Sequence, residues 1–481
     1  MIMDSNFLNY DAFLSMTHEI SLVAVLVILL LADLLIGKNK KTFQYLAITA
    51  FAIHTILGFT TFAPMVAGQG DNPILGGSYI QGEAGTFVKN ILNVGTLIVF
   101  FFSFEWNDRD NRKSVGEFYF LTLSTLIGMY FMVSAGDFLF FYIGLEAASI
   151  PLAALVALNK KGTEGIEAAA KYILTASFSS GIMLFGISLI YGACGSLYFD
   201  EVQTAFSVIT PLHGFALVCF IAGVGFKISL VPFHFWTADT YQGAPTGVTS
   251  FLSVISKGAA VFALMCILYK AFSNDPELWQ NVLTWLVVAT ITIGNLFAIR
   301  QKNLKRFLAF SSISQAGYII LGILASTQTG MSSTIYYILI YMFTNLAAFG
   351  IIAVIENKTG KVGMDDYNGL YQTNPKLAFA MTLAMFSLGG IPPFAGFFSK
   401  FFIFAAASEQ GLYGLVFYAL LNTIVSLYYY LLVVKAMFIN KSDSPIEAIK
   451  IDSMSRVALL VCMVAILSIG FIHHIYENIF S

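Results

Sequence analysis

The chain has 481 residues, of which 58% are hydrophobic and only 11% are Lys, Arg, Asp or Glu. A soluble globular protein carries about 25% charged residues, so this chain could not cover a water-exposed surface. With a mean hydropathy of +0.79, the composition excludes a soluble enzyme, a nucleic-acid-binding protein and a disordered chain. An integral membrane protein remains.

Continuous apolar runs recur along the whole chain, and a helix needs about 20 such residues to cross a bilayer. Apolar and polar residues do not alternate within the runs, which favours helices over the strands of a barrel. About fourteen runs are long enough, and they lie near residues 20–36, 43–63, 85–104, 116–134, 137–158, 165–191, 212–236, 246–270, 279–299, 304–325, 332–355, 376–407, 411–438 and 455–475. The predicted fold class is an all-α integral membrane protein, in one polytopic domain over residues 1–481.

The basic residues predict how the chain is oriented. Most of the 25 Lys and Arg residues fall in the connections after odd-numbered runs, whereas the connections after even-numbered runs hold only Lys270. Because Lys and Arg gather in cytoplasmic loops, the side rich in these residues is predicted to be cytoplasmic. Both termini are then expected on the outer side.

A few charged residues fall inside the apolar runs. Lys89 and Lys435 lie close enough to a helix end to extend their amino groups to the interface. The remaining ones are predicted to lie at membrane depth: Glu146, Lys171, Lys227, Lys257 and Lys400. Each such lysine costs at least about 2.5–3.5 kcal/mol on insertion scales, so a functional reason is expected.

Proton transfer is one function that these buried charges could serve. Structural ion pairing is the simpler explanation for any single lysine, but one buried carboxylate cannot neutralise four lysines. Burial lowers the pKa of a lysine and a nearby carboxylate raises it. A lysine whose carboxylate partner moves can therefore bind and release a proton near neutral pH. The pattern predicts a proton relay that needs no cofactor.

Two of the predicted helices contain breaks. Pro232 follows Lys227 by five residues, and the second break precedes Lys400. Proline removes a backbone donor, and such breaks at membrane depth occur where backbone lines a cavity or is buried in protein. Broken helices in both halves of a transporter point to an ion site. The residues of the second break are Gly389, Gly390, Pro392 and Pro393.

The spacing of the breaks predicts an internal repeat. They fall in the seventh and twelfth helices, so helices 4–8 and 9–13 would cross the membrane in opposite senses. We therefore expect three N-terminal helices within residues 1–114, a first repeat over 115–272, an inverted second repeat over 273–440, and a C-terminal helix within 441–481.

The other reactive residue types say less. His234 follows the first break and lies between Lys227 and Lys257 along the chain, so it is either a relay residue or a satisfied interhelical donor. The four cysteines are isolated, which disfavours an iron–sulfur or zinc site. No phosphate-binding glycine loop is present, so direct use of NADH or ATP is not expected.

Four segments resemble the antiporter-like subunits of respiratory complex I, and subunit N most of all. They are FYIGLEAASIPL (141–152), FKISLVPFHFWTADTYQGAPT (226–246), SSISQAGY (311–318) and GGIPPFAGFFSKF (389–401). The resemblance implies fourteen helices with two inverted five-helix bundles and no redox centre in this chain. NADH, FMN, iron–sulfur clusters and quinone would be bound by partner subunits.

The resemblance also assigns roles to the buried charges. Glu146 matches the fifth-helix glutamate and Lys227 its lysine partner, while Lys171 matches a lysine that modulates this pair. Lys257 matches the central lysine that links the halves, and Lys400 the terminal lysine of the outward half-channel. Subunit M carries a glutamate at that last position, which favours N. Gly247 departs from the family pattern, which usually has proline there.

Together these observations predict a proton-translocating subunit driven by quinone reduction elsewhere in the complex. The expected partners are subunits M and K, the peripheral NADH-oxidising arm indirectly, and the lipid bilayer of a bacterial inner membrane. Nucleic acid is not expected as a partner. A stand-alone or Mrp-type cation/proton antiporter is the nearest alternative, and a purely structural membrane spacer is the alternative of another class.

Overall fold

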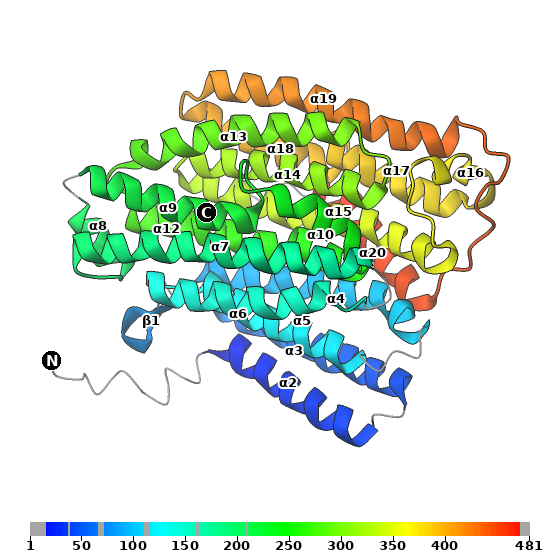
Figure 1. Ribbon diagram of the computed structural model, residues 1–481, viewed down its shortest axis with the longest axis horizontal. Coiled ribbons are helices and arrows are strands. Elements are labelled where there is room, and N and C mark those ends of the chain that lie inside the picture. The colour runs from blue at the N-terminus through cyan, green and yellow to red at the C-terminus, as the bar shows by residue number, and fades with distance from the viewer. Residues whose placement is uncertain are drawn as a thin grey trace.

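A computed structural model describes residues 16–36, 39–65, 72–109, 115–159, 163–206 and 210–471. Long helices run side by side through the molecule and make up nearly all of it (Figure 1). The prediction of an all-α membrane protein is confirmed. Within the described ranges, thirteen helices are long and apolar enough to cross a membrane.

The helices of the N-terminal half are α2 (Thr17–Ile36), α3 (Lys40–Met65), α4 (Glu83–Arg109), α5 (Val115–Val133), α6 (Phe138–Val156), α7 (Thr163–Cys194), α8 (Phe199–Ala205), α9 (Pro211–Ile228), α10 (Phe235–Gly243), α11 (Thr246–Phe251), the π-helix η2 (Leu252–Ser256) and α12 (Lys257–Ala271). A short hairpin precedes α4 and was not predicted. It consists of β1 (Asn72–Ile74) and β2 (Tyr79–Gln81), which pair antiparallel, with the 3-10 turn η1 (Leu75–Gly77) between them.

The second half contains α13 (Pro276–Ile299), α14 (Leu304–Leu324), α15 (Gln328–Thr359), the 3-10 turn η3 (Asp365–Tyr367), α16 (Leu370–Thr373), α17 (Pro375–Gly389), α18 (Ala395–Glu409), α19 (Tyr413–Phe438) and α20 (Ser453–Phe471). The predicted run 376–407 is thus two shorter helices, α17 and α18, on either side of the second break. Neither is among the thirteen candidate spans, so together they account for the remaining one of the fourteen predicted runs. The last run was predicted to reach residue 475, and its final residues lie outside the described ranges.

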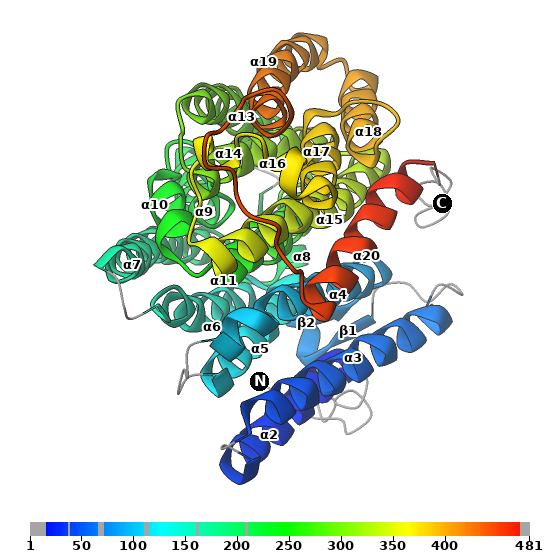
Figure 2. The same ribbon diagram turned by 90° about the vertical axis from the view of Figure 1, so that its right-hand side faces the viewer.

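The centre of the bundle is formed by α14, α15 and the continuous segment Thr246–Ala271, which are almost wholly buried. Helices α2 and α19 lie at opposite edges (Figure 2). They expose large apolar side chains such as Leu35 and Phe417, as expected of surfaces that face lipid. Helix α20 returns to pack against α4, α15 and α18, which joins the two ends of the chain to the bundle.

Both predicted breaks are present, and each has a local cause. Helix α9 ends at Ile228 and α10 begins at Phe235, with Ser229 in the left-handed conformation at φ 70°. Pro232 has no N–H to donate to the carbonyl of Ile228, four residues earlier, so the helix cannot continue.

The second break follows the same rule. Helix α17 ends at Gly389, and Gly390 adopts φ 79°, a conformation that glycine reaches without steric cost. Pro392 cannot donate to the carbonyl of Leu388, and Pro393 cannot donate to that of Gly389. The two carbonyls are therefore free to accept hydrogen bonds from side chains at membrane depth.

Candidate functional site

Lys227 lies in the last turn of α9, directly before the first break, and is only 3% exposed. Its Nζ donates to Ser149 Oγ of α6 at 2.8 Å and to Tyr172 Oη of α7 at 3.3 Å. The hydrogen-bond partners described for this lysine are therefore neutral hydroxyls. A hydroxyl can donate as well as accept, so this pocket can hold the amino group in either protonation state.

Glu146 lies on α6, one helical turn before Ser149. Its side chain is half-buried and accepts a hydrogen bond from Ser180 of α7, whose Oγ also lies 3.1 Å from Tyr142 Oη. The sequence predicted that Glu146 and Lys227 form a pair, but within the described residues no ion pair joins them. The carboxylate is held on the α7 side. Ser149, one turn further along α6, contacts Lys227 instead.

Lys171 was predicted to be buried, and that prediction is wrong. Its side chain is 45% exposed, and its Nζ lies 2.7 Å from Glu167 Oε1 and 2.7 Å from Asp239 Oδ2. Asp239 of α10 also binds Arg306 of α14, at 2.5 Å. Ion pairing therefore explains Lys171, because one turn of α7 and the second half of the broken helix both place carboxylates beside it.

His234 directly precedes α10 and is 7% exposed. Its ring lies against Phe235, with centroids 4.6 Å apart, and its Nδ1 has no hydrogen-bond partner among the described residues. No direct hydrogen bond joins it to Lys227 or Lys257 there. The first break thus places one ring nitrogen in the interior without a partner.

Lys257 is 2% exposed and follows the π-helix η2, which lies between α11 and α12. A π-helical turn inside an α-helix is rare and is found frequently at functional sites. Lys257 Nζ donates to Ser312 Oγ of α14 at 2.6 Å and to the Ser312 carbonyl at 3.1 Å. The central lysine is therefore also held by neutral oxygens.

Lys400 lies on α18 and is 5% exposed. Its Nζ donates to the Leu388 carbonyl at 2.9 Å and sits 5.0 Å from the ring centroid of Tyr318. The carbonyl is the one that Pro392 leaves free, so the second break supplies the acceptor for this lysine. Beside it is a cavity of about 10 Å³, enough for about one water molecule, lined by Gln315, Tyr337, Tyr341, Thr344 and Ser387 among others.

A chain of hydrogen bonds runs along α14 between the neighbourhoods of Lys257 and Lys400. Ser311, next to Ser312, hydrogen-bonds Tyr430 Oη at 2.6 Å. Gln315 Nε2 donates to Tyr430 Oη at 3.0 Å and to the Leu388 carbonyl at 3.4 Å, and that carbonyl also binds Lys400. Sequence reasoning missed these polar residues as site residues, although the SSISQ segment that contains three of them was already noted as a motif.

A larger polar cavity of about 520 Å³ lies where α10 meets α11. Its lining includes Glu164, Gln242, Thr246, Lys305 and Glu356. Lys305 Nζ donates to the Ala244 carbonyl at 3.0 Å and lies 3.3 Å from Glu356 Oε1. This cavity is on the side that the basic connections predict to be cytoplasmic.

Lys89 was predicted to reach the outer interface, and that prediction is also wrong. Its side chain is 3% exposed and pairs with Glu19 of α2 at 2.6 Å. Glu19 was not among the residues predicted to be functional. Among the described residues no cluster of three or more His, Cys, Asp and Glu is suited to hold a metal ion.

Two broken helices, each with a buried lysine beside the break, and a third buried lysine between them define a membrane protein of the antiporter-like class. Residues 135–426 match the family described as "NADH:quinone oxidoreductase/Mrp antiporter, TM". NADH-quinone oxidoreductase subunit N of Azobacteroides pseudotrichonymphae is 54% identical over 476 residues, which cover 98% of each chain. The same subunit of Phocaeicola vulgatus is 53% identical over 472 residues, again 98% of each chain. The chain therefore belongs to the family of antiporter-like membrane subunits that includes subunit N, as its sequence motifs predicted.

Solved structures agree with this assignment. A chain of respiratory complex I from Thermus thermophilus with bound aureothin superimposes with a TM-score of 0.79 at 31% identity, covering 95% of this chain and 97% of that one. A chain of the Mrp complex from Dietzia sp. DQ12-45-1b has a TM-score of 0.87 at 20% identity, over 98% and 96% of the two chains. The Mrp likeness shows a shared fold, whereas sequence identity places this chain nearer the complex I subunits.

Proposed function

We propose that this chain is a proton-translocating membrane subunit of an NADH:quinone oxidoreductase and works through its buried lysines. The observation that carries the proposal is the placement of Lys227, Lys257 and Lys400, each beside a helix break or π-helix and each held by neutral oxygens. A buried lysine held in this way keeps its hydrogen bonds whether or not an acid lies near it. Its proton affinity can then be controlled by a movable carboxylate.

Glu146 is that carboxylate. It now binds Ser180, and rotation of its side chain towards Ser149 would bring negative charge nearer Lys227. An approaching carboxylate favours the protonated lysine, and a retreating one favours release of the proton. Quinone reduction elsewhere in the complex would drive this movement, which makes the chain part of a translocase with no redox chemistry of its own.

The polar groups at the centre of the bundle indicate the direction in which protons would move. The 520 Å³ cavity beside Lys305 is the proposed cytoplasmic inlet. His234, with its unpartnered Nδ1, relays between Lys227 and Lys257 through water, and the Ser311–Tyr430–Gln315 chain leads from Lys257 to Lys400. Lys171 acts at the periphery, where its ion pair with Asp239 fastens α7 to α10 next to Tyr172, a hydrogen-bond partner of Lys227.

We infer the setting from the subunit N relatives. We place the chain in a bacterial inner membrane with both termini on the outer side, next to subunits M and K, and we assign NADH, FMN, iron–sulfur clusters and quinone to other subunits. The first and second halves, 115–272 and 273–440, serve as inverted repeats with one broken helix each.

Lys227→Met and Glu146→Gln in the assembled complex test the relay. Each variant is expected to lower the number of protons moved per NADH oxidised, measured in sealed vesicles by a pH-sensitive dye. Lys435→Met on α19 is the matched control, because this lysine is exposed and outside the chain of buried groups. Unchanged proton-to-electron ratios in both relay variants would refute the proposal.

The Lys227→Met complex and the isolated chain distinguish the proposed function from a structural spacer and from a stand-alone antiporter. A structural spacer predicts that Lys227→Met reduces the amount of assembled complex but leaves the proton-to-electron ratio of the remaining complex unchanged. A stand-alone antiporter predicts exchange of Na⁺ or K⁺ for protons by this chain alone in proteoliposomes.

A further inference from the structure

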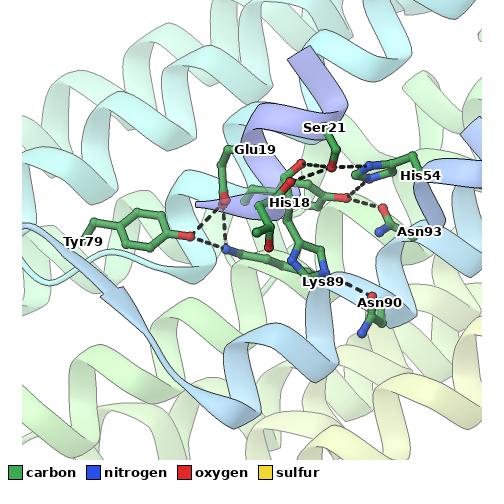
Figure 3. A network of polar contacts seen from close by, with 10 residues as sticks. His18, Glu19, Ser21, His54, Tyr79, Lys89, Asn90 and Asn93 are labelled. Atoms are coloured by element: carbon green, nitrogen blue, oxygen red, sulfur yellow. Dashed lines mark hydrogen bonds and ion pairs between the residues drawn. The ribbon is translucent and has the colours of Figure 1, made fainter. Parts of the chain in front are cut away.

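A second buried polar cluster lies in the N-terminal helices, outside the residues 135–426 that match the family model. It joins α2, α3, α4, α5 and strand β2 (Figure 3). Its members are titratable or hydrogen-bonding side chains, all of them buried except the half-buried Ser21: His18, Glu19, Ser21, His54, Tyr79, Lys89, Asn90, Asn93 and Tyr130. No part of the lysine relay contains them, and so many polar groups are costly to bury in a membrane.

The charged part of the cluster is an ion pair with a phenol. Lys89 Nζ lies 2.6 Å from Glu19 Oε1 and donates to Tyr79 Oη at 2.9 Å, while Tyr79 donates to Glu19 Oε2 at 3.0 Å. The three groups close a triangle beside the hairpin. A lysine and a carboxylate in contact neutralise each other, so the pair alone does not explain the two histidines beside it.

His54 has hydrogen-bonded neighbours at both ring nitrogens. Its Nδ1 lies 2.9 Å from Ser21 Oγ and its Nε2 lies 3.0 Å from Tyr130 Oη. Ser21 uses its one hydroxyl proton on the Thr17 carbonyl at 2.6 Å, and Tyr130 uses its own on Asn93 Oδ1. Both neighbours therefore offer lone pairs to the ring. Only the protonated imidazolium has two N–H groups to donate to them.

The same neighbours can also serve the neutral ring. If Ser21 Oγ–H turns from the Thr17 carbonyl to Nδ1, the ring needs only the Nε2–H that it gives to Tyr130. The Thr17 carbonyl stays within the helix when this happens, so rotation of the Ser21 hydroxyl costs about one hydrogen bond. Asn93 Nδ2 has no partner among the described residues, so turning that amide would let Tyr130 donate to the ring instead.

The groups around the His54 ring are suited to its reversible protonation. From α2, His18 lies with its ring centroid 6.4 Å from that of His54, and Glu19 follows it. From α5, Tyr130 stacks on His54 at 6.3 Å. Lys89 of α4 lies 5.5 Å from the Tyr130 ring, so its charge faces the same space. The carboxylate of Glu19 attracts a proton to the cluster, and Lys89 repels it.

We propose that His54 is a second proton-binding site of this chain, in which the Ser21 and Tyr130 hydroxyls reorient as the ring gains or loses a proton. The neutral ring gains a proton at Nδ1 from a hydronium ion of the solvent as the Ser21 O–H turns back to the Thr17 carbonyl, and on release the proton returns to water. No bond other than N–H and O–H changes. A part for this site in pumping rests on the proposed function, whereas proton binding itself does not.

Nuclear magnetic resonance of the full chain in lipid bilayers, with ¹⁵N-labelled histidine, tests the binding. The chain has six histidines, and His54→Gln identifies the signal of His54 by its loss. His213→Gln is the control, because His213 caps α9 and lies outside the cluster. As the pH is lowered over the range in which the chain stays folded, the His54 signal is expected to change from one protonated nitrogen to two. One bare ring nitrogen throughout that range would overturn the proposal.

Proton pumping by the assembled complex tests the consequence. Glutamine can hydrogen-bond Tyr130 but binds no proton, so a purely structural His54 predicts an unchanged proton-to-electron ratio in His54→Gln. We expect a lower ratio, with a loss no larger than that of Lys227→Met. If Lys227→Met lowers the ratio and His54→Gln does not, the pumping role of His54 fails and the proposed function stands. If the His54 signal titrates but Lys227→Met has no effect, the proposed function fails and the proton site stands.

Discussion

Removal of the Glu19 carboxylate is predicted to leave Lys89 as an unpaired cation inside the protein. Glu19 accepts from Lys89 at 2.6 Å and from Tyr79 at 3.0 Å, and the side chains of the ion pair are 5% and 3% exposed. Loss of one partner of a buried ion pair costs about 3–5 kcal/mol, because the remaining charge is neither paired nor solvated. Glu19→Leu and Lys89→Met should each destabilise the chain by about that amount.

The double variant distinguishes this reasoning from a simple loss of packing. When both charges become apolar groups of similar volume, no charge is left buried, so Glu19→Leu/Lys89→Met should recover to within about 1 kcal/mol of the wild-type chain. The assay is denaturant-induced unfolding of the purified full chain in mixed micelles, followed by tryptophan fluorescence. Lys41→Met is the control, because Lys41 pairs with Asp108 at the surface, where removal of a partner costs about 0–1 kcal/mol. Additive losses in the double variant would refute the argument.

Two further predictions concern the second break and the central lysine. Gly396→Ala should prevent assembly, because a Cβ there would lie 1.8 Å from the Ser387 carbonyl oxygen of α17, whereas Gly414→Ala on α19 has open space and should assemble normally. The amount of complex in the membrane checks both, and a fully assembled Gly396→Ala complex would contradict the close packing of α17 on α18. Ser312→Ala removes the 2.6 Å bond to Lys257, worth about 1.5–3 kcal/mol, so proton transport should slow by about tenfold or more. Ser312→Thr should restore the transport rate, and a wild-type rate in Ser312→Ala would show that the hydroxyl does not hold the lysine during turnover.

Much of the fold could be predicted because it depends on properties that run along the chain. The length of each apolar run predicts a crossing, since every backbone polar group must be satisfied within its helix. The breaks could be predicted as well, because Pro232 and Pro392 remove backbone donors wherever they stand. The burial of Lys227, Lys257 and Lys400 followed from their positions deep within these runs.

The residues that hold those lysines could not be predicted, because they come from other helices. Ser149 and Tyr172 reach Lys227 from α6 and α7, and Ser312 reaches Lys257 from α14. A serine or tyrosine in an apolar run has the same appearance in sequence whether it faces lipid, a neighbour or a charge. Only the assembled bundle selects its partner.

Lys171 and Lys89 show most clearly what could not be predicted from the sequence. Depth along a helix can be read from sequence, but the direction in which a side chain faces depends on which helices pack around it. Lys171 lies in the apolar run that became α7, yet it points to an exposed edge where Asp239 and Glu167 meet it. Lys89 lies near a helix end, yet α2 and β2 cover it and bring Glu19 and Tyr79 to its amino group. Sequence alone therefore determined which charges fall within the apolar runs, and the tertiary structure decided which of them are buried and what each one touches.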